Sequence, residues 1–105
     1  VFGPVVVVIP YDDEDDAVRI ANDSDYGLHG AVFSADAQHA LEVAMRIDTG
    51  TVAINSFDVP VSAPFGGVKG SGVGRENGVE GYDSFLEYHS YKLTPELAGR
   101  LADRG

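Results

Sequence analysis

Apolar residues follow two different spacings along the first half of the chain. Val5–Ile9 is an unbroken β-branched run, typical of a parallel strand covered on both faces. Gly30–Phe33 and Thr51–Asn55 are shorter runs of the strand type. Between them, apolar positions recur at helical spacing in Ala17–Ala21 and in a second segment from residue 34 to about residue 49. The pattern therefore predicts strand, helix, strand, helix, strand.

The connections between these strands are long enough for helical crossovers, which predicts parallel strands. Five acidic residues, Asp12–Asp16, stand at the start of the first helix, where Asp12 or Asp13 can cap it and the rest oppose its dipole favourably. A calcium loop is the alternative, but the spacing, central glycine and final glutamate of an EF-hand are absent. Gly50 is expected to end the second helix.

The second half of the chain predicts a long loop followed by three short elements. Ser56–Gly74 has little regular pattern. A helix is expected over Gly78–Leu86, a strand over Tyr88–Leu93, and a terminal helix over Thr94–Gly105, opened by Pro95. The first of these helices is expected to bury its large apolar side chains, Val79, Tyr82, Phe85 and Leu86. The predicted fold class is α/β: a parallel βαβαβ segment, a glycine-rich loop, a helix and a C-terminal strand.

Composition narrows the possible functions. A length of 105 residues suits one domain, and a net charge of −10 argues against binding to nucleic acid or to an anionic membrane surface. The absence of cysteine excludes a thiol nucleophile or a thiolate metal site within this chain. No apolar run approaches the roughly 20 residues that cross a bilayer. His29, His39 and His89 are scattered, without metal-ligand spacing.

Two features lead us to expect a piece of a larger protein. The chain begins at Val1, directly before a strand and without a secretory signal. In addition, two helices cannot cover three parallel strands, and each buried Val or Ile contributes about 1.5–3 kcal/mol only if a cover exists. We expect a cytoplasmic location, and marginal stability for the chain in isolation.

The segment Pro64–Gly78 contains six of the thirteen glycines. It does not match the Walker loop for phosphate, in which the lysine follows a glycine, because Lys69 comes before Gly70. It does not match the dinucleotide-binding fingerprint Gly-x-Gly-x-x-Gly either, because Arg75 occupies the position of the third glycine. Ser71 lacks the context of a nucleophile elbow. The residues alone leave Glu76 open as a helix cap or as a base that positions water.

Four motifs occur in sequence order. They are Phe2-Gly3-Pro4-Val5 before a strand, Ala21-Asn22-Asp23-Ser24-x-Tyr26-Gly27-Leu28, Gly50-Thr51-Val52-x-Ile54-Asn55, and Pro64-Phe65-Gly66-Gly67-x-Lys69-x-Ser71-Gly72-x-Gly74-Arg75-Glu76-x-Gly78. Together they resemble the C-terminal part of the aldehyde dehydrogenase superfamily. The resemblance covers the chain from Val1 to about Leu93.

Members of that family oxidise aldehydes to carboxylic acids with NAD or NADP, through a thiohemiacetal on a cysteine. The resemblance implies that residues 1–80 are the end of the catalytic domain, residues 81–94 a helix end and an oligomerisation strand, and residues 95–105 a tail. The cofactor domain, the nucleophile and the general base would lie in a missing N-terminal portion. This chain alone is therefore expected to be inactive. The implied partners are a small aldehyde, that missing portion, and further copies in a dimer or tetramer.

The resemblance also implies roles for individual residues near the active site. Phe2 matches an aromatic beside the nicotinamide ring, and Phe65 one that lines the substrate tunnel. Glu76 matches a carboxylate assigned to a water or proton path. Phe57 and Asp58 lie where substrate-facing residues vary.

Other matched positions concern support and assembly. Asn55 and Lys69 match residues that support the loop structurally. Tyr88–Leu93 would pair with a neighbouring subunit's sheet, and Arg75 is a candidate partner for Glu87 across that interface.

Two alternatives remain at this stage. A non-catalytic oligomerisation or interaction module of the same shape would be encoded with its own start and stop, whereas a part of an enzyme would follow an in-frame, cysteine-bearing body. A small acidic metal-binding domain would bind Ca²⁺ tightly, which we do not expect.

The implied interface role of Glu87 can be tested by charge reversal. In the complete enzyme, Glu87→Lys should weaken activity or assembly, because the new charge would repel the partner arginine. Enzyme kinetics and size-exclusion chromatography measure the two effects. Normal kinetics together with a normal oligomer size would contradict the role.

Overall fold

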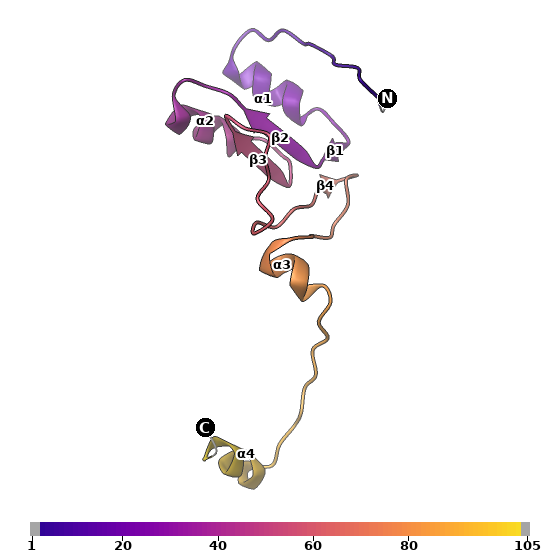
Figure 1. Cartoon of the computed structure of the whole chain (residues 1–105), viewed down its shortest axis with the longest axis vertical. Helices are drawn as coiled ribbons and strands as arrows, with labels where there is room; N and C mark the ends of the chain where they lie inside the picture. The colour runs from indigo at the N-terminus through magenta and orange to yellow at the C-terminus, as the bar shows by residue number, and fades with distance from the viewer. Residues whose placement is uncertain (1–2, 104–105) are drawn as a thin grey trace.

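A computed structural model describes residues 3–103 of the chain. The elements, in order, are α1 (Glu14–Asn22), β1 (Tyr26–Gly27), β2 (His29–Val32), α2 (Ala37–Ala44), β3 (Thr51–Ile54), β4 (Val68–Lys69), α3 (Gly78–Asp83) and α4 (Pro95–Ala102). The elements from α1 to β4 lie together at one end, and an extended arm leads from α3 to α4 at the other (Figure 1). The chain is elongated, with extents of 69 × 32 × 22 Å.

Two small sheets form the body. β2 and β3 pair in parallel, with His29 opposite Thr51 and Val32 opposite Ile54. β1 and β4 pair antiparallel. The parallel pair joined by α2 is one βαβ unit, and the α/β class is confirmed. The prediction of three parallel strands is wrong for the described chain, because the parallel sheet has two.

The missing strand is Val5–Ile9, which is extended but pairs with no other described segment. Its side chains are 56–86% exposed. A strand is defined by hydrogen bonds to a neighbour, and none of the described segments supplies that neighbour. The apolar run therefore has the composition of a buried strand without the surroundings of one.

The predicted cap of the first helix is confirmed, and the second helix begins at Ala37, three residues later than predicted. Asp13 caps α1 by accepting a hydrogen bond from the Asp16 N–H at 2.9 Å, and Asp36 caps α2 in the same way. The hydrogen bond from Arg19 lowers the pKa of Asp16 below its usual value, so this bond is lost as the pH falls through that lowered pKa.

The predicted end of the second helix at Gly50 is wrong, because α2 ends at Ala44. The chain then continues in a tighter, 3₁₀-type turn, in which Ile47 N–H donates to the carbonyl oxygen of Ala44 at 3.1 Å. Gly50 has a different role: a Cβ atom there would overlap with the Gly66 carbonyl oxygen. Glycine at this position allows the loop to pass directly against the start of β3.

The second half departs further from the sequence-based prediction. α3 ends at Asp83, and the four side chains expected to be buried by it, Val79, Tyr82, Phe85 and Leu86, are exposed. Tyr88–Leu93 is extended and exposed, and does not form a strand. α3 adjoins the loop at its start, where Gly78 N–H donates to the Val61 carbonyl oxygen at 3.1 Å, whereas Tyr88–Leu93 lies on the arm that leads away from the body (Figure 1). The terminal helix is confirmed, since Thr94 caps α4 and Pro95 begins it.

The described chain buries few apolar side chains: Val18, Ala40, Ala44 and Ala53. Among the described residues, no helix has the length and apolar character needed to cross a lipid bilayer.

Candidate functional site

The glycine-rich segment is closed into a loop by a pair of backbone hydrogen bonds at its ends. Phe65 N–H donates to the Glu76 carbonyl oxygen at 2.7 Å, and Glu76 N–H donates to the Phe65 carbonyl oxygen at 2.8 Å. The structure therefore brings together two of the residues predicted to form the site. The Phe65 side chain is half-buried, whereas Glu76 is exposed.

The Arg75 side chain forms hydrogen bonds inside this loop. Its Nη1 atom donates to the carbonyl oxygens of Gly67 and Gly74, both at 2.8 Å. Hydrogen bonds from a charged donor are stronger than those between neutral groups, so Arg75 stabilises the closed loop. No ion pair joins Arg75 to Glu87 within residues 3–103, and Glu87 lies exposed on the arm.

Lys69 anchors the loop to the body. Its ammonium donates to the Asn22 carbonyl oxygen at 3.0 Å and forms an ion pair with Asp48 at 3.0 Å. The Ser71 hydroxyl accepts a hydrogen bond from the Gly27 N–H at 3.0 Å nearby. These contacts agree with the expectation that Lys69 supports the loop.

Asn22 is a structural residue that links three parts of the chain. Its side-chain amide donates to the Arg46 carbonyl oxygen at 2.8 Å, and its Oδ1 accepts from the Asp48 N–H at 2.7 Å. With Lys69 on its backbone oxygen, Asn22 joins α1, the turn after α2, and β4. In the sequence, the importance of Asn22 is indicated by its place in the second motif, but the motif does not indicate its hydrogen-bond partners.

Asn55 closes the other end of the parallel sheet. Its amide accepts from the Ser34 N–H and donates to the Ser34 carbonyl oxygen, both at 2.9 Å. Its φ is 52°, a left-handed conformation that asparagine tolerates better than most residues. Asn55 thus extends the β2–β3 pairing with its side chain, as the expected structural role requires.

Phe57 and Asp58 are not brought next to Phe65. The Phe57 ring packs on Phe33 just after β2, with centroids 5.1 Å apart, and Asp58 N–H donates to the Ser56 hydroxyl. The Phe65 ring lies beside His29, the first residue of β2. His29 and Phe33 are four residues apart, which corresponds to about 13 Å along a strand. The Phe65 and Phe57 rings therefore lie near opposite ends of β2. Phe2 lies outside the described residues.

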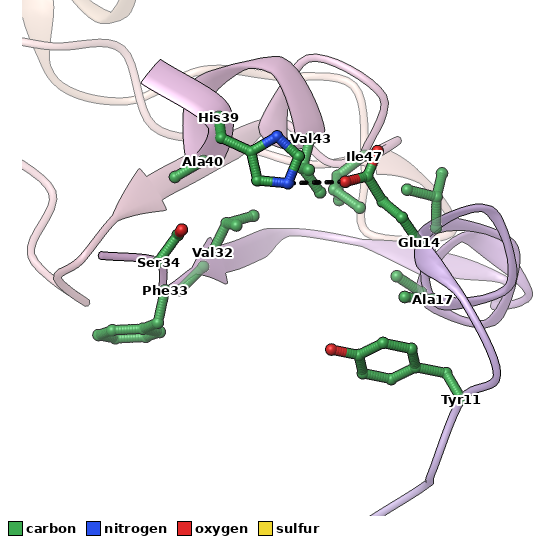
Figure 2. A pocket seen from close by; sticks show the side chains of 13 residues that line it. Tyr11, Glu14, Ala17, Val32, Phe33, Ser34, His39, Ala40, Val43 and Ile47 are labelled. Carbon is green, nitrogen blue, oxygen red and sulfur yellow. Dashed lines mark ion pairs between the residues drawn. The ribbon is translucent and has the colours of Figure 1, made fainter. Parts of the chain in front are cut away.

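An apolar cavity lies elsewhere, between α1 and α2 over β2, with a volume of about 490 Å³ (Figure 2). Its lining is mainly apolar. At one side, Glu14 pairs with His39 at 2.8 Å and with Arg46 at 2.8 Å. A hydrogen bond from Arg46 to Asp15 is the main cause of the raised pKa of Arg46. None of the predicted site residues lines this cavity.

The described residues do not fit the phosphates of a dinucleotide. Helix N-termini bind phosphate through their exposed N–H groups. Here the two helices of the body carry carboxylate caps, Asp13 on α1 and Asp36 on α2, which would repel an anion. Within residues 3–103 there is also no group of three His, Asp or Glu side chains able to hold a metal ion.

Comparison with known proteins shows the family. The model of the aldehyde dehydrogenase family matches residues 1–91. The chain is 53% identical over 93 residues to the geranial dehydrogenase of Castellaniella defragrans, covering 89% of this chain and 20% of that protein. It is 51% identical over 98 residues to aldehyde dehydrogenase NAD(P)+ 1 of Saccharomyces cerevisiae, covering 92% and 19%.

A solved structure agrees. The Mycobacterium tuberculosis aldehyde dehydrogenase complexed with NAD+ superposes with a TM-score of 0.78 at 46% identity, covering 88% of this chain and 20% of that one. The chain belongs to the aldehyde dehydrogenase family. It spans about a fifth of the length of the relatives that it matches.

The anchoring role of Lys69 can be tested by hydrogen exchange. Lys69→Met keeps the aliphatic stem but removes both polar contacts, so the loop should open more often, at a cost of about 1–2 kcal/mol. Amides of residues 66–75 should then exchange roughly 5–30 times faster. Lys92→Met, on the exposed arm, is the matched control. Unchanged exchange in Lys69→Met, or an equal change in the control, would contradict the anchoring role.

Proposed function

We propose that this chain forms the C-terminal part of the catalytic domain of an enzyme that oxidises an aldehyde to a carboxylic acid with NAD or NADP. The observation that supports it best is the identity of about one half, across about nine-tenths of the chain, to proteins named as aldehyde dehydrogenases. The cysteine that would form the thiohemiacetal, the general base and the cofactor domain belong to the remainder of the enzyme. Residues 1–80 complete the catalytic domain, residues 81–94 reach a neighbouring subunit, and residues 95–105 are a tail.

In this proposal Phe65 supplies one apolar wall of the aldehyde tunnel. Phe65 is half-buried, so part of its surface remains available to a ligand. Apolar walls of this kind contribute most of the surface of small-molecule sites. The paired backbone of Phe65 and Glu76 fixes the position of the ring. Phe57 and Asp58 then contribute to a second part of the tunnel, at the opposite end of β2.

Glu76 is proposed to act on a water or proton path close to the same site. Its backbone pairs with that of Phe65, and directly opposed residues of an antiparallel pair project to the same side. The exposed carboxylate can therefore accept a hydrogen bond from a water molecule near the Phe65 ring. Phe2 is proposed to lie beside the nicotinamide; NAD or NADP would carry the hydride and be bound mainly by the remainder of the enzyme.

The arm supports the proposal of a homo-oligomer. Tyr88–Leu93 is extended and exposed, and such a segment offers unpaired backbone groups to another sheet. Arg75 uses Nη1 for the loop, and its guanidinium has further donors that can reach Glu87 of a neighbouring subunit. A cytoplasmic location is part of the same proposal.

The proposal can be tested by transplanting this chain into a relative. Residues 1–91 replace the corresponding fifth of the Mycobacterium tuberculosis enzyme, and oxidation of aldehydes is followed by the absorbance of the reduced cofactor. We expect kcat/KM within about tenfold of the parent enzyme, because the replaced surfaces are similar, and tenfold is about 1.4 kcal/mol. The isolated chain should be inactive, since it has no cysteine.

Two variants of the chimaera refine the test. Phe65→Ala should raise the KM for aldehyde about tenfold or more, because it removes the apolar wall. Val73→Ala, at a fully exposed position of the same loop, is the control and should change nothing. A folded, oligomeric chimaera that oxidises no aldehyde would contradict the proposal and favour a non-catalytic oligomerisation module.

A further inference from the structure

His29 lies beside Phe65 and takes no part in the proposed chemistry. The centroids of the two rings are 6.5 Å apart, with an interplanar angle of 52°, which is within the range of interacting aromatic pairs. His29 pairs with Thr51 across the parallel sheet, and paired residues of neighbouring strands face the same side. His29, Thr51 and Phe65 therefore form one cluster, on the side of the sheet that the loop covers.

The polar atoms of this cluster are buried without partners. Both ring nitrogens of His29 and the hydroxyl of Thr51 are enclosed, and none of them forms a hydrogen bond with residues 3–103. A buried donor or acceptor that loses its partner costs free energy, and native proteins contain few of them. Such a group calls for a physical explanation.

The enclosure comes from this chain itself, with the loop closed by the Phe65–Glu76 pair. His29 as a whole is partly exposed, so the enclosure applies to its two nitrogens. A displacement of the Phe65 ring away from the imidazole would open space beside them. In addition, no hydrogen bond to the described residues fixes the imidazole, so packing alone holds it in position.

We propose that His29 is a specificity-determining residue that acts through Phe65 and favours bulky aldehydes. This inference rests on the proposed function, because it takes Phe65 as a wall of the aldehyde tunnel. A large aldehyde displaces the Phe65 ring away from the imidazole, and the imidazole nitrogens then gain hydrogen bonds to water or to a polar group of the substrate. That gain offsets part of the cost of moving the ring. A short, straight-chain aldehyde leaves Phe65 in place and obtains no such benefit.

The test compares two substrates in the complete enzyme. The measured quantity is the ratio of kcat/KM for a bulky aldehyde, such as benzaldehyde, to kcat/KM for propanal. His29→Leu keeps an apolar packing group but removes the nitrogens, so the ratio should fall at least about fivefold, with the value for propanal unchanged. His29→Gln, which retains a donor and an acceptor, should restore most of the ratio.

A stability measurement separates this effect from a general structural defect. His29→Leu should raise the melting temperature or leave it unchanged, because it removes unpartnered buried atoms. His39→Leu, in the cavity between α1 and α2, is the matched control and should not change the substrate ratio.

Each remaining outcome overturns the inference. An unchanged ratio in His29→Leu shows that the imidazole does not influence the tunnel. A lower melting temperature of His29→Leu, or its failure to fold, shows that the imidazole already has a stabilising partner in the wild-type protein. An equal fall in His39→Leu shows a non-specific effect. If the wild-type enzyme oxidises neither aldehyde, the proposed function fails, whereas the melting temperature of His29→Leu still reports on the buried nitrogens.

Discussion

The apolar side chains that this chain buries are few and small. Val18, Ala40, Ala44 and Ala53 are its buried hydrophobic residues, while the valines before α1 and the aromatic residues after α3 are exposed. Burial of apolar surface is the main source of folding free energy, so the described chain obtains little of it alone. Its elements are instead joined by specific hydrogen bonds at a few positions. The geometry of the candidate site depends on those bonds.

Asn22 and Lys69 illustrate this arrangement. Through them, the end of α1, the turn after α2, and β4 meet at one point, from which the glycine-rich loop departs. The loop returns to Phe65 through its pairing with Glu76. A glycine at position 50 lets it lie against the parallel sheet. The position of the Phe65 ring is thus determined by backbone contacts, which do not depend on a large core. In the proposed function, these contacts would let a short segment carry a wall of a site whose reactive groups lie elsewhere.

Local features were predictable from the sequence, and features that depend on missing neighbours were not. Asp12 or Asp13 could be assigned as the cap of α1, and Pro95 as the start of α4, because these signals involve residues within a few positions of one another. The βαβ unit followed from the spacing of apolar residues. Val5–Ile9 forms no strand within the described chain, because its pattern reflects burial that the described chain does not provide. The same reason applies to Tyr88–Leu93.

The candidate site was only partly accessible from the sequence. The motif placed Phe65 and Glu76 in one segment, but their direct pairing depends on how the loop closes. Asn22 was missed because its partners are 24 and 26 residues away. The unpartnered nitrogens of His29 could not be foreseen at all, since burial of individual atoms requires the packed loop.

The central claim is that the exposed apolar segments are completed by the remainder of an aldehyde dehydrogenase. Hydrogen exchange of the amides of Val5–Ile9, compared between the isolated chain and the complete enzyme, tests it most directly. We predict exchange at nearly the unfolded rate in the isolated chain and strong protection in the enzyme, because there the run pairs as a strand. Equal exchange in the two, whether fast or slow, would contradict the account.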